Sequence, residues 1–149
     1  MIELVVTAVF TASSILLLAY WFRYTCLLIM SAKTTRDYAV SVATANQLGF
    51  LDVQAQLCEA APDLDPLKAA LDRDYKVLTY LLKHAANGAE EGAIEKRMLE
   101  IDYRVMSAWY SVSRRFSQSA ASHAIEEMAL VVAHFANAMG ERSSVGAAA

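Results

Sequence analysis

An uncharged run over residues 4–22 constrains this chain more than any other feature of its sequence. The run, LVVTAVFTASSILLLAYWF, holds 19 residues without a charge, a proline or a glycine. An α-helix rises about 1.5 Å per residue, so about 20 residues cross the roughly 30 Å hydrocarbon core of a bilayer. The sequence therefore predicts a transmembrane helix at the front of the chain. Residues 33–149 carry twelve basic and fifteen acidic side chains, as in an ordinary soluble helical protein.

The end of this run has the composition of a membrane–water interface. Aromatic and basic side chains gather there, namely Tyr20, Trp21, Arg23, Tyr24 and Lys33, and such residues are typical of the headgroup region. A rival span over residues 12–32 places Arg23 near mid-bilayer, which costs about 2.5–3.5 kcal/mol on insertion scales. That span needs a buried carboxylate or a partner subunit beside the arginine. We therefore favour the span over residues 4–22.

The front of the chain differs from a cleaved signal peptide. MIELVV contains an acid and no base, and no A-x-A site follows the run. Residues 22–25 also lack the small apolar side chains that a lipidated Cys26 requires. Basic residues follow the span, so the positive-inside rule predicts a single-pass protein of the cell (inner) membrane, with its N-terminus outside and its C-terminal domain cytoplasmic. Two cysteines, Cys26 and Cys58, fit that reducing compartment.

The rest of the chain has the apolar periodicity of helices and no strand pattern. We expect helices over residues 36–60, from about 66 to 86, over 90–117 and from about 122 to 139. Asp65 is predicted as an N-cap, with Pro66 at the first helical position, and Gly88 and Gly140 as helix ends. The fold class is all-α: an anchor with its juxtamembrane extension (1–32), a cytoplasmic antiparallel bundle of about four helices (33–140) and a tail (141–149).

The helix predicted over residues 90–117 has two opposed apolar faces, so it must pack on both sides. One face carries Ile94, Met98, Ile101, Val105, Ala108, Val112 and Phe116. The other face carries Leu99, Tyr103, Met106 and Tyr110, which we predict to dock a partner because aromatic residues and methionine are enriched in interface cores. Trp109 is expected in the core. Asp74, within an apolar stripe, is expected at the edge of that stripe or paired with an arginine or a tyrosine hydroxyl.

No catalytic, metal or cofactor site is predicted. His123 and His134 share a face but lie about 16 Å apart along a helix. No histidine follows a glutamate by three residues, as in di-iron bundles. We therefore expect no enzyme, and low basic content makes a nucleic-acid partner improbable. His84 and His134 are weak candidates for the axial ligands of a cofactor.

Topology and architecture together suggest a function by contact. The first hypothesis is a non-catalytic accessory or scaffolding subunit of a larger membrane complex, whose partners are the lipid bilayer and other subunits. The first alternative is a protein that assembles with copies of itself into a ring, tube or filament. The second alternative is a membrane-anchored signalling or sensor bundle.

Overall fold

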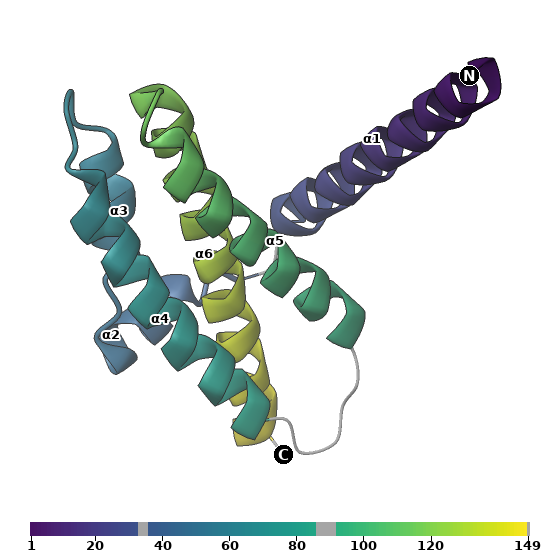
Figure 1. The fold of residues 1–149 in the computed structure, drawn as a ribbon. Coiled ribbons are helices and arrows are strands. Elements are labelled where there is room, and N and C mark those ends of the chain that lie inside the picture. The colour runs from purple at the N-terminus through teal and green to yellow at the C-terminus, as the bar shows by residue number, and fades with distance from the viewer. Residues whose placement is uncertain (33–35, 86–91, 149) are drawn as a thin grey trace. The chain divides into compact units, whose positions relative to one another are not determined.

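The computed structural model describes residues 1–32, 36–85 and 92–148, and these residues form helices and no strand. The all-α prediction is therefore confirmed. The chain divides into two compact units, residues 1–32 and residues 33–149. The helices, shown in Figure 1, are α1 (Ile2–Ser31), α2 (Ala39–Asn46), α3 (Phe50–Leu57), α4 (Leu64–His84), α5 (Ala93–Ser113) and α6 (Gln118–Ala148).

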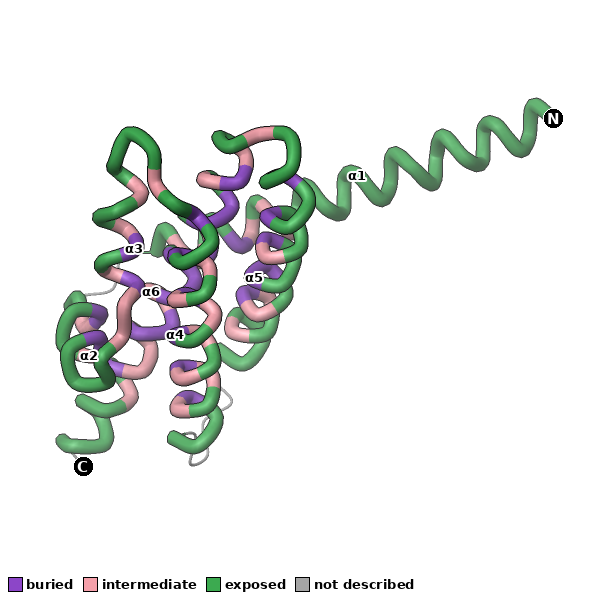
Figure 2. The backbone as a smooth tube through the Cα atoms, turned by 60° about the vertical axis from the view of Figure 1, so that its left-hand side comes forward, coloured by how far each residue is buried: buried purple, intermediate pink, exposed green. Residues whose placement is uncertain are grey.

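The first unit is the single helix α1, which is 30 residues long and apolar enough to cross a membrane. Its hydroxyl side chains bond to the helix itself. Thr7, Thr11, Ser14 and Thr25 each donate to the carbonyl oxygen four residues earlier, at 2.8 Å. These bonds satisfy the hydroxyl donors within the helix itself. Most residues of α1 are exposed, as the colouring of Figure 2 shows.

The second unit begins with two short helices where the sequence predicts a single helix over residues 36–60. The break follows Asn46, because Gln47 adopts the left-handed conformation with φ of 53°. A carboxylate from α4 stabilises this break. Asp74 accepts the backbone N–H of Gly49 at 2.7 Å, and Arg73 donates to the carbonyl oxygen of Gln47 at 3.1 Å. The prediction of one helix is wrong because these bonds come from a segment 25 residues away.

Asp74 is completely buried, and it also pairs with Arg73 at 3.3 Å. The expectation that it lies at the edge of the apolar stripe is wrong. Burial of a carboxylate is tolerated when it is paired and hydrogen-bonded. Its position therefore joins the turn between α2 and α3 to the middle of α4.

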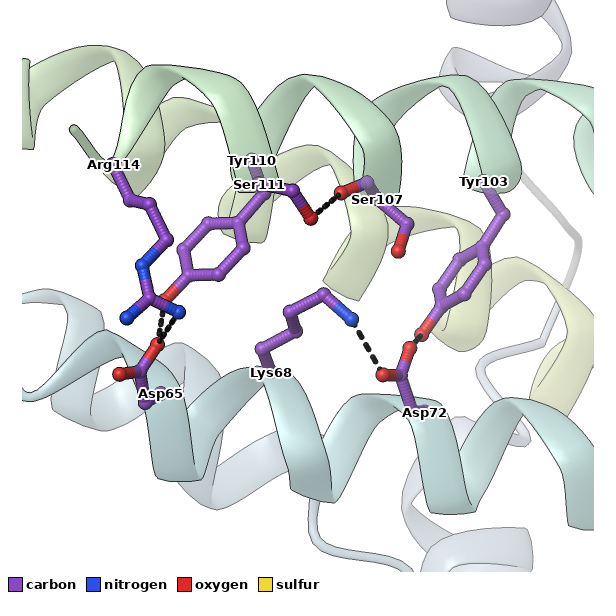
Figure 3. Close-up of polar contacts among 8 residues, drawn as sticks. All are labelled: Asp65, Lys68, Asp72, Tyr103, Ser107, Tyr110, Ser111 and Arg114. Atoms are coloured by element: carbon purple, nitrogen blue, oxygen red, sulfur yellow. Dashed lines mark hydrogen bonds and ion pairs between the residues drawn. The ribbon is translucent and has the colours of Figure 1, made fainter. Parts of the chain in front are cut away.

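The start of α4 differs from the prediction by two residues. Asp63 is the N-cap, with extended backbone angles, so Asp65 and Pro66 both lie within the first turn. Asp65 is thereby free of the predicted capping role, and its side chain points toward α5 (Figure 3). Two predicted features, the helix end at Gly88 and the interfacial Lys33, lie outside the described residues.

Helix α6 lies at the centre of the second unit, and α2, α3, α4 and α5 all contact it. Its inward side carries the largest share of the core, including Ile125, Met128, Val132 and Phe135. The prediction that Gly140 ends this helix is wrong, since α6 continues to Ala148. Residues 141–148 are therefore helical, although the sequence predicts a tail without structure.

Gly140 serves a packing role within α6. A Cβ atom at this position would lie 2.1 Å from Cβ of Tyr38, just before α2. The backbone N–H of Tyr38 donates to Oδ1 of Asn137 at 2.8 Å, one helical turn earlier on α6. The absence of a side chain at Gly140 thus lets the start of α2 approach the backbone of α6.

Candidate functional site

Four of the predicted membrane-interface residues lie together on the second half of α1. Tyr24 stacks on Tyr20 with ring centroids 6.3 Å apart, and its edge meets Trp21 at 6.4 Å. All three aromatic side chains are exposed. Arg23 lies among them in sequence, directly after the uncharged run. The aromatic rings therefore form one cluster on the helix, as an interfacial belt requires.

The predicted partner interface on α5 lies inside the second unit. Leu99, Tyr103, Met106 and Tyr110 are all buried, and they face the neighbouring helices of their own chain. The prediction that these four residues form a free docking face is therefore wrong. Two of them are tyrosines, whose hydroxyl groups reach polar partners that isoleucine or valine would leave unpaired.

The opposite face of α5 is exposed. We call it the outer face, and it comprises Ile94, Ile101, Val105, Trp109 and Val112, together with Phe116 in the turn that follows the helix. Phe116 exposes 70% of its surface and Trp109 exposes 48%, so the expectation of a core position for Trp109 is wrong. Single exposed apolar residues need no explanation, but a continuous row marks a contact surface.

Three exposed arginines border the outer face along one side, and we call them the arginine edge: Arg97, Arg104 and Arg115. Arg97 and Arg104 are seven residues apart, close to two helical turns, so they lie in line on α5, and Arg115 follows in the turn just after the helix ends. Among the described residues, none of the three forms an ion pair with a carboxylate. Arg104 interacts with the hydroxyl of Tyr75 on α4, so the charges of Arg97 and Arg115 are the ones available to a partner.

The buried face of α5 is connected to α4 by a ladder of tyrosine and aspartate side chains (Figure 3). The hydroxyl of Tyr103 donates to Oδ1 of Asp72 at 2.8 Å, and the hydroxyl of Tyr110 donates to Oδ1 of Asp65 at 2.6 Å. The two aspartates are seven residues apart on α4, and their tyrosine partners are seven residues apart on α5 in the reverse order. The two helices are therefore antiparallel. Arg114 adds an ion pair to Asp65 at 2.8 Å.

The ladder bridges a wide gap between the two helices. Within the described part of the chain, no Cα atom of α4 lies within 8 Å of a Cα atom of α5. Tyr75 from α4 fills part of this gap and stacks on Tyr103, with ring centroids 3.9 Å apart and planes 3° from parallel. The helices are therefore held apart by aromatic rings rather than packed through small side chains.

The environment of the ladder keeps its tyrosines protonated. Burial raises the pKa of Tyr110 to about 12, and the hydrogen bond to the Asp65 carboxylate contributes to the shift. Burial and then the bond to Asp72 raise the pKa of Tyr103 well above its ordinary value. In both pairs a neutral hydroxyl donates to a carboxylate, which is among the stronger protein hydrogen bonds.

A groove of about 450 Å³ opens beside the ladder, between α4 and α5. We call it the α4–α5 groove. It is lined by Asp72, Tyr75, Lys76, Tyr103, Arg104, Ser107, Ala108 and Ser111. The mixture of two stacked aromatic rings, two cations and two hydroxyl groups suits a polar protein segment better than a hydrophobic small molecule.

The histidines lie in three different settings. Nδ1 of His84 lies 2.8 Å from the carbonyl oxygen of Tyr80, and Nδ1 of His123 lies 3.4 Å from a carboxylate oxygen of Glu126. His134 is half-buried, not solvated as its side of the helix suggests, and burial lowers its pKa. In the ranges that the structure describes, no three histidine, cysteine or acidic side chains converge on a common point for a metal ion.

The ladder is the feature that sequence reasoning missed. Its signal was present, because Asp65 and Asp72 are seven residues apart on one helix, as are Tyr103 and Tyr110 on the other.

Comparison with protein-family models, curated proteins and solved structures finds no match to this chain. The features of the chain that indicate a function are therefore α1, the outer face and the α4–α5 groove.

Proposed function

We propose that this chain is a single-pass membrane protein that acts by contact, as a non-catalytic accessory or scaffolding subunit of a larger membrane complex. In this proposal α1 crosses the cell membrane with its N-terminus outside. The second unit is then a cytoplasmic antiparallel helical bundle. The observation that carries the proposal is a 30-residue apolar helix followed along the chain by a unit whose α4 and α5 enclose a groove of aromatic and charged side chains.

Three properties of α1 support a membrane span. The helix is long enough to cross a bilayer, its hydroxyl groups bond to its own backbone, and its aromatic cluster lies where the uncharged run ends. The first basic residue, Arg23, lies within that cluster and further basic residues follow it, which favours a cytoplasmic second unit. Each property fits a lipid environment, and a soluble helix of this composition would expose a large apolar surface to water.

The α4–α5 groove is the surface that we propose for a partner subunit. Tyr75 and Arg104, which line this groove, belong to the residue types that dominate binding energy at protein interfaces. The stacked tyrosines are already fixed by the bond from Tyr103 to Asp72, so little side-chain entropy would be lost on binding. A rigid aromatic platform of this kind favours a specific protein contact.

The direct test is purification of the tagged full-length chain in mild detergent, followed by native mass spectrometry. We expect it to co-purify with a defined set of other membrane proteins. A series of oligomers or a closed ring that contains this chain alone would instead support self-assembly. A lone monomer would refute both hypotheses and leave a signalling role to be examined.

A pair of matched variants locates the contact. Ser111→Arg places a bulky cation in the α4–α5 groove, whereas Ser119→Arg makes the same change at an exposed position on α6. We expect Ser111→Arg to lose the co-purifying subunits and Ser119→Arg to retain them. Equal retention by both variants would show that the partner binds elsewhere.

A further inference from the structure

We propose that the outer face of α5 rests on an anionic lipid surface, with its apolar side chains at the level of the headgroups and its arginine edge against the phosphates. The inference depends on the proposed function, since it requires α1 to hold the chain at a membrane. It adds an occupant for a surface that the α4–α5 groove does not explain.

The composition of the outer face matches that of helices that lie in a bilayer interface. Such helices combine tryptophan, phenylalanine and aliphatic residues on one side with basic residues beside them. Here Trp109 and Phe116 stand among exposed isoleucine and valine side chains, directly next to the arginine edge. The bonds from Tyr103 and Tyr110 fix the other side of α5 to α4, so the outer face is presented rigidly.

The arginine edge is positively charged, whereas the whole chain carries a net negative charge. The protein carries a net charge of −3, so its average surface is repelled by anionic lipid. Along the arginine edge, however, three guanidinium groups have no carboxylate partner in the described residues. The nearest acid on that side, Glu100, is paired with Lys96 at 3.7 Å. Anionic headgroups are therefore the complementary partner, and they would select this face over the others.

Because the connection between α1 and α2 is short, a weak affinity of the outer face for lipid is enough to keep it on the membrane surface. Seven residues separate α1 from α2, and a chain of that length spans at most about 25 Å. A domain on so short a tether experiences a high effective concentration of lipid surface. Each basic residue near an anionic membrane strengthens binding by roughly fivefold, so Arg97 and Arg115 together contribute roughly 25-fold.

The two tryptophans of the chain give a direct test. Trp21 lies on α1 and Trp109 on the outer face, and the sequence contains no other tryptophan. The full-length Trp21→Phe and Trp109→Phe variants each keep one of them as a fluorophore. Both are reconstituted into phosphatidylcholine vesicles, with or without phosphatidylglycerol, that contain lipid brominated near the headgroup end of its acyl chains. Bromine quenches a tryptophan only on close approach.

We expect Trp109 to be quenched and blue-shifted in the vesicles that contain phosphatidylglycerol, with much weaker quenching in phosphatidylcholine alone. The Arg97→Gln/Arg115→Gln variant, which leaves the α4–α5 groove intact, should lower the ratio of docked to undocked protein by roughly 25-fold. The control Lys83→Gln removes an exposed charge from α4 outside the α4–α5 groove and should leave quenching unchanged.

The remaining outcomes each overturn a defined part of the account. Quenching of Trp21 without quenching of Trp109 would refute lipid docking alone, and would leave the outer face to a protein partner or a second copy. Equal quenching of Trp109 in both lipid mixtures would refute the role of anionic headgroups. Absence of quenching at both tryptophans would refute the membrane span and thus the proposed function.

Discussion

Substitution of Gly140 by alanine should destabilise the second unit, although alanine is the better helix former. The added Cβ would lie 2.1 Å from Cβ and 2.7 Å from Cγ of Tyr38. Carbon atoms in contact are normally about 3.5–4.0 Å apart, so the start of α2 would have to withdraw by about 1.5 Å. A change of side-chain rotamer cannot relieve this clash, because both clashing atoms are Cβ atoms, whose positions are fixed by the backbone.

The expected free energy follows from three terms. Overpacking of a closely packed site costs about 1–3 kcal/mol, and a contact between two Cβ atoms belongs at the upper end. Withdrawal of α2 also stretches the bond from Tyr38 to Asn137, now 2.8 Å, whose loss costs about 1 kcal/mol. Alanine recovers about 1 kcal/mol through helix propensity. We therefore expect Gly140→Ala to lower the free energy of unfolding by about 2–3 kcal/mol.

Gly146→Ala is the matched control, because it makes the same change on the same helix with no atom within 4 Å of the new Cβ. It should stabilise by a few tenths to about 1 kcal/mol. Both variants are compared in the full-length chain in detergent micelles by urea unfolding. The near-ultraviolet circular dichroism of the stacked Tyr75 and Tyr103 reports on the second unit. A Gly140→Ala variant as stable as the original protein would refute the close approach of α2 to α6.

Three further perturbations test other parts of the second unit. Asp74→Ala should cost about 2–3 kcal/mol because it removes a buried charged acceptor, whereas Asp74→Asn keeps an oxygen for the N–H of Gly49 and should cost less in the same urea titration. The raised pKa of Tyr110 means that its contribution is complete below the ordinary value of 10 and is lost as the pH rises toward about 12, so Tyr110→Phe should flatten the alkaline stability profile. The lowered pKa of His134 means that the folded state binds its proton less readily than the unfolded state does. Stability should therefore decline as the pH falls below about 6.5, and His134→Asn should reduce that slope.

The elements whose helical pattern is local could be predicted from the sequence. The uncharged run predicts a helix at the front, and α1 extends over that run and beyond it. Leu67, Leu71, Leu78 and Leu82 of the stripe predicted for α4 are buried. Both results depend on side chains within a few turns of each other, where periodicity is informative.

The contacts between distant segments could not be predicted in the same way. The break after Asn46 depends on a carboxylate of α4, and the role of Gly140 as a contact point for Tyr38 depends on a segment about 100 residues earlier in the chain. Sequence periodicity also gave α5 two apolar faces without showing which one is inside. By hydrophobicity the isoleucine and valine face is the better core, yet only tyrosines reach across the gap to Asp65 and Asp72.

The most direct test of the central claim is the sidedness of the two units in intact cells. The Cys26→Ser variant keeps exposed Cys58 in the second unit, and Ile2→Cys in a chain without either native cysteine reports on the start of α1. Both are treated with a membrane-impermeant maleimide before and after the membrane is permeabilised. The account predicts that the cysteine at position 2 reacts in intact cells and that Cys58 reacts only after permeabilisation. Reaction of both cysteines in intact cells, or release of the chain from membranes by alkaline carbonate, would contradict it.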